Sequence, residues 1–222
     1  MLSSIDAAII NKYTQKTGDI SYSVANVYWK RPFDLFVAIL VCVFILSWLI
    51  PIVGIIIKLS SRGPILFVQL RTGRNGHLFK CLKFRTMWQN CDKEGFQQTC
   101  LNDPRVTPIG KWLRKTNLDE MPQFLNVIVG DMSVVGPRPH AIQHDAQYWI
   151  DLPNYHKRYF VLPGITGLAQ VRGARGITDH SMKMEHRLRY DLLYIKNRSL
   201  LYDIKICWWT AKATLQGDTN AW

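Results

Sequence analysis

The stretch that decides the fold runs from Leu35 to Ile57 and reads LFVAILVCVFILSWLIPIVGIII. Its 23 residues carry no formal charge, and roughly 20 helical residues are enough to cross the hydrocarbon core of a bilayer. The stretch is too long and too far from the N-terminus to be the apolar part of a signal peptide. The rest of the 222-residue chain is too small to surround such a helix on every side. We therefore expect a membrane helix.

The topology of this helix has two interpretations. Pro51 removes a backbone donor inside the stretch, and Ser47 and Gly54 lie close to it, so the helix could break there and return to the same face of the membrane. A spanning helix that is only kinked at Pro51 is the alternative, because membrane helices tolerate proline. Basic residues flank both ends, so they give no bias toward one side; they are Lys30, Arg31, Lys58 and Arg62. The residues alone leave both topologies open.

The composition narrows the class of protein and its partners. Hydrophobic residues make up 48% of the chain, which excludes a disordered protein, and a mean hydropathy of −0.05 excludes a polytopic membrane protein. The net charge of +12 suits either nucleic acid or an anionic membrane surface. We expect the anionic membrane and no nucleic acid, because the apolar stretch is present and no nucleic-acid-binding motif is. Five cysteines without a CxxC pair indicate reduced thiols on the cytoplasmic side.

Turn residues divide the chain into three parts: an N-terminal arm (1–29), the membrane helix (30–60) and a catalytic domain in the cytoplasm (61–222). Asn75-Gly76 separates two β-rich runs, Ile65–Leu70 and His77–Phe84, and predicts a hairpin. Further segments are expected in this order: a polar loop at 90–102, a helix over Ile109–Arg114, a helix from about Asn117–Asp119 to Val129, a glycine-rich loop over Leu162–Gly176, and amphipathic helices over Ser181–Asn197 and Asp203–Leu215.

Asp119 and Glu120 are adjacent acids in a largely basic chain. One interpretation is structural: Asn117 caps a helix and Glu120 completes a capping box, although Pro122 would fit better if Asp119 were the cap. The other is catalytic, because a carboxylate can attack a phosphoryl group once nearby cations neutralise the phosphate. The candidate phosphate-binding cations are Lys83, Arg85, Arg114 and Arg138, of which Arg138 is held between two prolines.

The spacing of His140 and His144, with Asp145 beside them, could in principle hold a metal ion. No third ligand follows at a diagnostic spacing, so we expect a solvated helix face instead.

Several strings together resemble the bacterial sugar transferase family, the monotopic polyprenyl-phosphate phosphoglycosyl transferases. The resemblance covers about residues 30–215 in order. The strings are KRPFD (30–34), the apolar stretch with Pro51, KFRTM (83–87), LDE (118–120), NVIVGDMSVVGPRP (126–139), PGITG (163–167) and the stretch from Tyr190-Asp191 to Tyr202-Asp203-Ile204-Lys205.

The resemblance implies an enzyme at the cytoplasmic face of the bacterial inner membrane. Such enzymes transfer a phosphosugar from a nucleotide diphosphate sugar, usually a UDP-sugar, to polyprenyl (undecaprenyl) phosphate, and UMP leaves. Asp119 would be the nucleophile that carries the phosphosugar, and Asp119 and Glu120 would bind Mg²⁺. Lys83, Arg85, Arg114, Pro137 and Arg138 would bind the substrates. The implied fold is α+β and mainly helical, anchored by a re-entrant helix-break-helix, with a small hairpin and interfacial amphipathic helices.

The sequence departs from the family at two places. The helix break lacks an adjacent Ser-Pro, and Leu162 precedes Pro163 where relatives often have an arginine, so Arg158 or Arg172 could supply the nucleotide contact of that arginine. Two other functions are considered: a non-catalytic membrane scaffold for glycan assembly, and a membrane phosphohydrolase. The sequence does not determine the sugar, and a homodimer is compatible with it.

Overall fold

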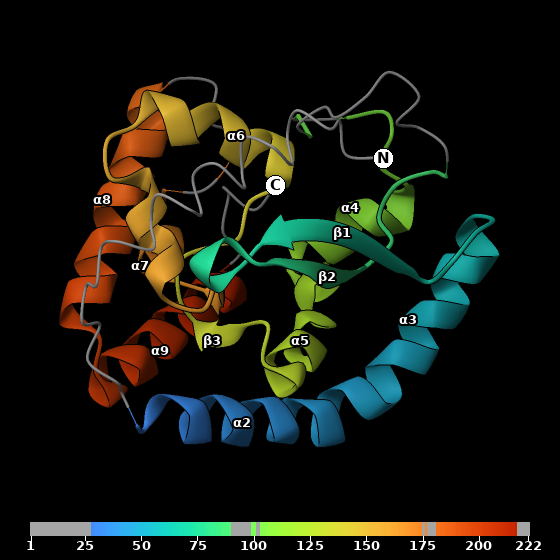
Figure 1. Ribbon diagram of the computed structural model, residues 1–222. Coiled ribbons are helices and arrows are strands. Elements are labelled where there is room, and N and C mark those ends of the chain that lie inside the picture. Colours follow the sequence, from blue (N-terminus) through green and yellow to red (C-terminus); the bar gives the residue numbers. More distant parts are fainter. Residues whose placement is uncertain (1–27, 90–98, 101–102, 175, 177–180, 217–222) are drawn as a thin grey trace.

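The long apolar segment forms one helix with an irregular middle. The computed structural model describes residues 28–89, 99–100, 103–174, 176 and 181–216; most of the expected N-terminal arm and of the polar loop at 90–102 lie outside these residues. Helix α2 (Lys30–Val41) continues through a wide π-helical turn (Cys42–Leu46) into α3 (Ser47–Ser60). Figure 1 shows α2 along one edge of the molecule and α3 turning away from it. By length and composition this helix could cross a membrane.

The irregular turn lies before Pro51, not at it, which corrects the expected position of the break. Pro51 lies inside α3, which stays helical around it. Proline lacks an amide proton and crowds the carbonyl four residues earlier, so strain is relieved in the preceding turns. Two side chains bond carbonyls of the wide turn: Ser47 Oγ donates to Val43 O (2.6 Å) and Trp48 Nε1 to Phe44 O (2.7 Å).

Both halves of this helix pack on the same globular domain. Leu46 at the end of the wide turn and Leu49, Val53 and Ile57 on α3 form a buried cluster with Phe84 and Leu113. Helix α2 contacts α5 (Gln123–Val129) and strand β3 (Ser133–Val135). The opposite face of the helix exposes large apolar side chains: Phe36, Ile39, Leu40, Val43, Phe44, Trp48, Ile52, Ile55, Ile56 and Leu59. The helix therefore has one face that belongs to the protein core and one apolar face that is uncovered.

The predicted hairpin is confirmed. Strands β1 (Leu66–Thr72) and β2 (Leu78–Phe84) pair antiparallel, with Leu66 opposite Phe84 and Thr72 opposite Leu78. Asn75 and Gly76 have φ values of 56° and 78°, the left-handed conformation that this dipeptide tolerates well. The hairpin places Lys83 near the end of β2, and this residue belongs to the site described below.

The other helices agree with the sequence in type, with small shifts in their ends. Helices α4 (Pro108–Lys115), α8 (Ser181–Asn197) and α9 (Leu200–Gln216) lie where helices were expected. The expected helix from Asn117 to Val129 is divided into a 3-10 turn (Leu118–Glu120) and α5. Asn117 does not cap it, which corrects the capping-box interpretation: its φ of 56° ends α4, and its side chain makes no cap bond.

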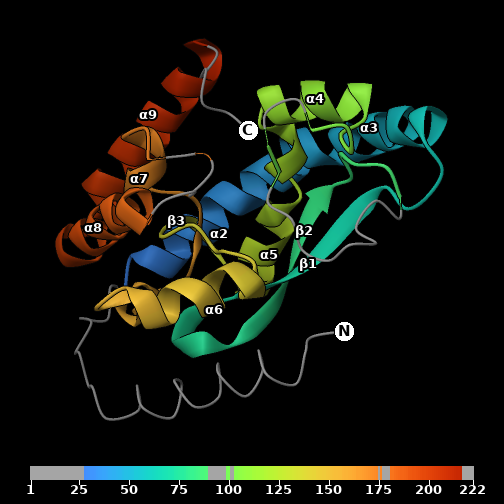
Figure 2. The same ribbon diagram turned by 90° about the horizontal axis from the view of Figure 1, so that it is seen from above.

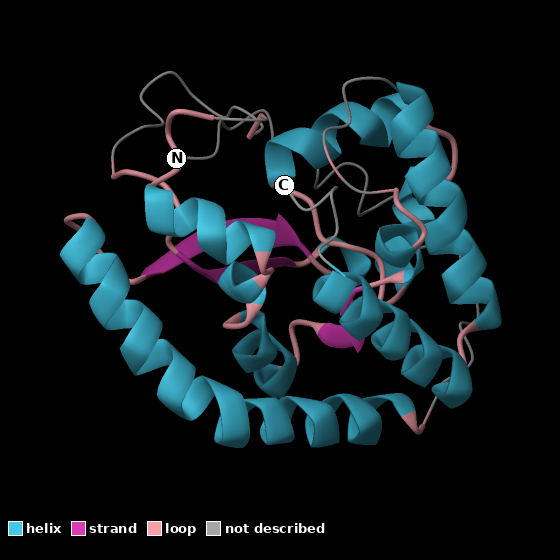
Figure 3. Ribbon diagram, turned by 180° about the vertical axis from the view of Figure 1, so that it is seen from behind, coloured by secondary structure: helices cyan, strands magenta, loops and turns pink. Residues whose placement is uncertain are grey.

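The region between α5 and α8 holds elements that the sequence did not predict. Strand β3 pairs in parallel with β4 (Gly164–Thr166), and α7 (Leu168–Val171) follows, so the glycine-rich loop is partly regular structure. Helix α6 (Ile142–Asp151) and a 3-10 segment (Tyr155–Phe160) complete the chain order. Figures 2 and 3 show α6 to α9 grouped at one side of the molecule and the hairpin with α4 and α5 at the other.

A buried carboxylate joins the start of α2 to the domain. Asp34 is fully buried and accepts hydrogen bonds from Ser133 Oγ and the Val134 amide, both at 3.0 Å. Lys30 Nζ lies 3.2 Å from Asp34 Oδ1 and 2.5 Å from Asp203 Oδ2 on α9. One charged cluster therefore connects α2, β3 and α9.

Replacing Asp34 by alanine should destabilise the protein strongly. Removing Asp34 leaves the buried Val134 amide without its acceptor and Lys30 with only Asp203 as a partner. Each buried hydrogen-bonding group left unpaired typically costs about 1–3 kcal/mol. The free energy of unfolding can be measured by chemical denaturation in detergent. Glu185→Ala is the control, because Glu185 pairs with Arg189 on the surface and such pairs contribute at most about 1 kcal/mol. Equal losses in the two variants would contradict this role of Asp34.

Candidate functional site

Glu120 brings together three segments that are far apart in the sequence. Its Oε1 lies 2.6 Å from Lys83 Nζ on β2. Arg138 Nη1 donates to its Oε2 at 2.8 Å, and Arg138 Nη2 donates to its Oε1. The bidentate geometry is the strong form of an arginine–carboxylate contact. The 3-10 turn, the hairpin and the Pro137–Pro139 segment therefore meet at one carboxylate.

The charges around Glu120 keep it ionised. Burial alone would raise the pKa of Glu120, but Arg138 and Lys83 together hold that pKa well below its usual range. Burial lowers the pKa of Lys83, and the Glu120 charge opposes this shift. Because both of its oxygens are already bonded, Glu120 is a fixed anion in this arrangement.

Asp119 has a different environment from its neighbour. Its side chain is buried, with a residue exposure of 7%, and no described residue donates a hydrogen bond to it. Burial raises the pKa of Asp119 to about 6; the charge of Lys83 opposes the rise, and that of Glu120 adds to it. Asp119 is therefore a carboxylate with free oxygens that is largely ionised near neutral pH.

Arg114 lies close enough to Asp119 for its charge to act on that carboxylate. Its Nε donates to Thr86 Oγ1 at 2.9 Å. Helix α4, which carries Arg114, begins at a side-chain cap: Thr107 Oγ1 accepts from the Gly110 amide at 3.0 Å. Gly110 packs directly on the Thr86 backbone, where a Cβ would come within 2.1 Å of the carbonyl oxygen. This close packing fixes the position of Arg114.

Arg85 is the predicted cation that the structure does not bring to the two acids. Its Nη2 donates to Ser61 O at 2.7 Å and to Ser61 Oγ at 2.8 Å. Arg85 therefore bonds the residue that ends α3. Of the predicted substrate-binding residues, Lys83, Arg114 and Arg138 surround Asp119 and Glu120, with Pro137 beside Arg138.

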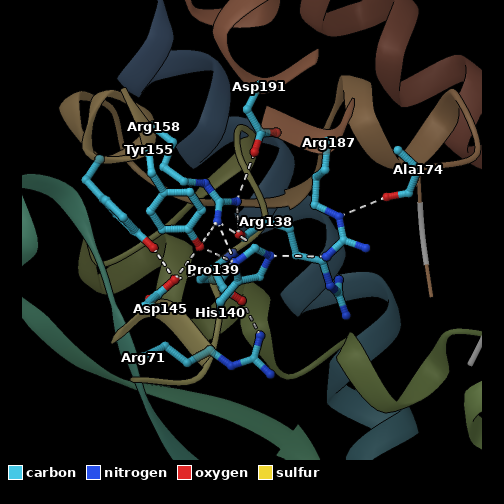
Figure 4. Close-up of polar contacts among 11 residues, drawn as sticks. Arg71, Arg138, Pro139, His140, Asp145, Tyr155, Arg158, Ala174, Arg187 and Asp191 are labelled. Carbon is cyan, nitrogen blue, oxygen red and sulfur yellow. Dashed lines mark hydrogen bonds and ion pairs between the residues drawn. The ribbon is translucent and has the colours of Figure 1, made fainter. Parts of the chain in front are cut away.

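The Pro137-Arg138-Pro139 segment is held on several sides. Gly164 donates its amide proton to Pro137 O at 2.9 Å, Arg158 Nη2 donates to Arg138 O at 2.7 Å, and Arg71 Nη1 donates to Pro139 O at 2.6 Å. Figure 4 shows both arginines reaching this segment. Because the backbone is bonded on each side of Arg138, its guanidinium has a defined direction.

Glycines allow the chain to pack closely next to this segment. A Cβ on Gly164 would lie 2.1 Å from Gly136 N, and a Cβ on Gly167 would lie 2.2 Å from Gly136 O. Both distances are to backbone atoms and would force the two loops apart. Sterics therefore explain the two glycines of the Pro-Gly-Ile-Thr-Gly segment: without side chains, they let β4 lie against the loop that carries Arg138.

The sequence missed the polar cluster behind Arg138. Arg158 is buried, pairs with Asp191 at 2.9 Å and bonds Tyr155 OH at 2.9 Å. Arg158, one of the two arginines expected as candidates for a nucleotide contact, instead directs its guanidinium to Asp191, Tyr155 and the Arg138 carbonyl in this structure. His140 is also buried and bonds Tyr155 OH at 2.8 Å, so a solvated helix face is wrong for this residue. Only the regular Tyr155, Arg158, Tyr159 spacing could have indicated a buried face.

The two acids do not fit a Mg²⁺ site built from both carboxylates. Each oxygen of Glu120 is bonded by a cation, and among the described residues there is no group of three His, Cys, Asp or Glu side chains placed to hold a metal ion. Asp119 keeps free oxygens. A magnesium ion commonly takes one or two carboxylates together with substrate phosphates and water, so Asp119 is the residue that could contribute.

The arrangement of charges in the site suits attack of a carboxylate on a phosphate group. A free, ionised carboxylate lies among Lys83, Arg114 and Arg138, all of which can attract and neutralise a phosphate group. A carboxylate in such a place can act as a nucleophile toward phosphorus, because the cations stabilise the charge that develops in the transition state.

Comparison with known proteins finds relatives that are named for the transfer of a sugar phosphate. The model of the family described as bacterial sugar transferase matches residues 25–217. The chain is 46% identical over 185 residues to UDP-glucose:undecaprenyl-phosphate glucose-1-phosphate transferase of Klebsiella pneumoniae, with 83% of this chain and 40% of that protein covered. It is 47% identical over 190 residues to exopolysaccharide production protein PSS of Rhizobium leguminosarum bv. phaseoli, with 84% and 94% covered.

A third relative is named for a different sugar. It is the UDP-N-acetylgalactosamine-undecaprenyl-phosphate N-acetylgalactosaminephosphotransferase of Aeromonas hydrophila, 39% identical over 207 residues, with 92% of this chain and 48% of that protein covered. The chain thus spans less than half the length of the Klebsiella and Aeromonas proteins and nearly all of the Rhizobium one. From the match over most of its length, the chain belongs to the bacterial sugar transferase family.

Proposed function

We propose that this protein transfers a phosphosugar from a UDP-sugar to undecaprenyl phosphate and so begins the assembly of a surface glycan. The observation that carries the proposal is the contrast between the two acids: Glu120 is bonded through both oxygens, whereas Asp119 is unbonded and surrounded by cations. The names of the Klebsiella and Aeromonas relatives support this donor and acceptor. Because the relative with the higher identity of these two is named for glucose, UDP-glucose is the first donor to test.

The reaction would proceed in two displacements at the same phosphorus atom. In the first, an Asp119 oxygen attacks the phosphorus that bears the sugar, the bond to the bridging oxygen breaks, and UMP leaves with that oxygen and its electron pair. In the second, a phosphate oxygen of the lipid attacks the aspartyl phosphosugar, and the Asp119 carboxylate is released. A covalent intermediate lets an aqueous and a lipid substrate use one small site in turn.

The other residues of the site have separate roles in this scheme. Lys83, Arg114 and Arg138 would neutralise the diphosphate and the leaving UMP. Glu120 holds Lys83 and Arg138 in place and keeps their charges from repelling one another. Mg²⁺ is expected to assist, with Asp119 and substrate phosphate oxygens as its ligands, and no step above depends on it.

The packing of the long helix supports a re-entrant anchor at the cytoplasmic face of the inner membrane. Both ends of the helix contact one domain, so a straight path across the bilayer would separate contacts that the fold buries. Helix α9 adds exposed apolar side chains, Leu201, Ile204 and Trp208, beside Lys205 and Lys212. This combination suits a helix that lies at the membrane surface.

A single assay of UMP release distinguishes the transferase from the two alternatives, a phosphohydrolase and a non-catalytic scaffold. If the protein is a transferase, the donor alone should give at most one UMP per protein molecule, and repeated UMP release should depend on polyprenyl phosphate. A phosphohydrolase would release UMP repeatedly without lipid, and a scaffold would release none.

Asp119→Asn should abolish formation of the covalent adduct and reduce turnover to background. Incubation with labelled UDP-glucose alone, followed by mass spectrometry of the peptide, measures the adduct directly. The raised pKa of Asp119 means that its ionised form costs stability as pH rises through the interval from about 4 to 6. The variant should therefore be at least as stable as the wild type above pH 6, which separates loss of chemistry from loss of fold. Normal turnover in this variant would show that the nucleophile is another residue.

The rate of adduct formation should fall in acid because only ionised Asp119 can attack. With a pKa of about 6, the carboxylate is about 90% ionised at pH 7 and about 10% at pH 5. The measured quantity is kcat/KM for the donor between pH 5 and 8, with thermal melting at each pH as a control for unfolding. A flat profile over this range would argue against Asp119 as the attacking group.

Single cysteines at the two ends of the helix should lie on the same side of the membrane. Tyr28 and Leu59 are 87% and 84% exposed, so Tyr28→Cys and Leu59→Cys can be made in a cysteine-free background. In intact cells an impermeant maleimide should label neither, and permeabilisation should expose both. Met182→Cys, 77% exposed on α8, is the control for the domain. Labelling of one end only in intact cells would establish a spanning helix.

A further inference from the structure

The half-buried Arg138 and the buried Arg158 and Arg187 lie together, and the first two have carboxylate partners. Arg138 bonds Glu120, and Arg158 pairs with Asp191 at 2.9 Å. The third, Arg187 on α8, is 7% exposed. Arg187 forms no ion pair with a described carboxylate; the charge of Asp191 acts on it, but Asp191 is already paired with Arg158.

The bonds of Arg187 position its guanidinium without neutralising it. Nε donates to Ala174 O at 3.0 Å and Nη2 donates to Gly176 O at 3.1 Å, while Nη1 lies 3.3 Å from His140 Nε2. Burial, together with the charges of Arg158 and Arg138 and against that of Asp191, lowers the pKa of Arg187 to about 10. A buried cation without a counter-ion is costly, and a bound anion would remove that cost.

The placement of Arg187 identifies the kind of anion. Figure 4 shows Arg187 and Arg138 on the same side of the His140 ring, and the charge of Arg138 acts on Arg187. Among the described residues around the two acids and this cluster, six are buried or half-buried cations (Lys83, Arg71, Arg114, Arg138, Arg158 and Arg187) and four are carboxylates (Asp119, Glu120, Asp145 and Asp191). The excess of positive charge suits a phosphate or diphosphate dianion.

We infer that Arg187 is a second arginine of the substrate-binding site, which binds a phosphate group beside Arg138. The inference rests on the proposed function for the identity of the substrates. The phosphate could belong to the nucleotide donor or to the lipid acceptor, and the two displacements allow each to be tested separately.

The alternative is that Arg187 only holds the loop carbonyls of Ala174 and Gly176. Two substitutions separate the roles. Arg187→Gln removes the charge, and Arg187→Lys keeps the charge but loses the planar fork that reaches both carbonyls. Arg189→Gln is a matched control, because Arg189 lies on the same helix, 74% exposed, and pairs only with Glu185 among the described residues.

The first experiment measures the UDP-glucose concentration that gives half-maximal adduct formation without lipid. If the donor phosphate binds Arg187, Arg187→Gln should raise this concentration about 10- to 100-fold, as expected for loss of a charge-assisted bond. For Arg187→Lys this concentration should stay within about threefold of the wild-type value. If the glutamine variant does not fold, the lysine variant alone is used for the test. Arg189→Gln should match wild type.

The second experiment measures discharge of preformed adduct by undecaprenyl phosphate in detergent. If the lipid phosphate is the ligand, Arg187→Gln should slow this step while adduct formation stays normal. The inference fails if both steps are unchanged in folded Arg187→Gln, or if Arg187→Lys is as weak as Arg187→Gln, which would indicate the loop role. Failure of the wild-type protein to form any adduct would instead contradict the proposed function.

Discussion

The ion-paired Glu120 is the interaction on which the site depends. Its two oxygens hold Lys83 from the hairpin and Arg138 from the loop after β3, segments that share no local connection. Without this anion, two buried cations would face each other at short range, and the loops that carry them would separate. The same pairing leaves Asp119 as the acid with free oxygens, so a contact that maintains the fold also determines which of two adjacent acids can react.

The pKa values of the two acids differ because of their surroundings and not because one is an aspartate and the other a glutamate. Aspartate and glutamate have similar intrinsic pKa values. Bonded cations hold the pKa of Glu120 low, whereas burial without hydrogen bonds raises that of Asp119. A raised pKa also makes a carboxylate more basic and hence a better nucleophile, provided that it remains ionised at the working pH. A value of about 6 meets both conditions at neutral pH.

Local sequence signals predicted the elements well and the long-range contacts poorly. Asn75-Gly76 identified the hairpin, and apolar periodicity identified Ser181–Asn197 with its observed ends. Asn117 was misread because its left-handed conformation ends one helix instead of starting the next. The burial of His140 and Arg158 could not be predicted, since it depends on Tyr155 and Asp191, which meet them only after folding. The two acids and the four candidate cations stood out from the residues themselves, and the resemblance to a family assigned their roles. Three of these cations lie at the acids, whereas Arg85 bonds Ser61 after α3.

The inner face of the long helix has a practical consequence. Leu46, Leu49, Val53 and Ile57 complete a cluster with Phe84, which ends the strand carrying Lys83, and with Leu113, the neighbour of Arg114. Removing this helix would therefore uncover the core directly behind Lys83 and Arg114. The helix and the domain on which it packs form one folding unit, and a fragment without the helix is not expected to keep the arrangement of the two cations.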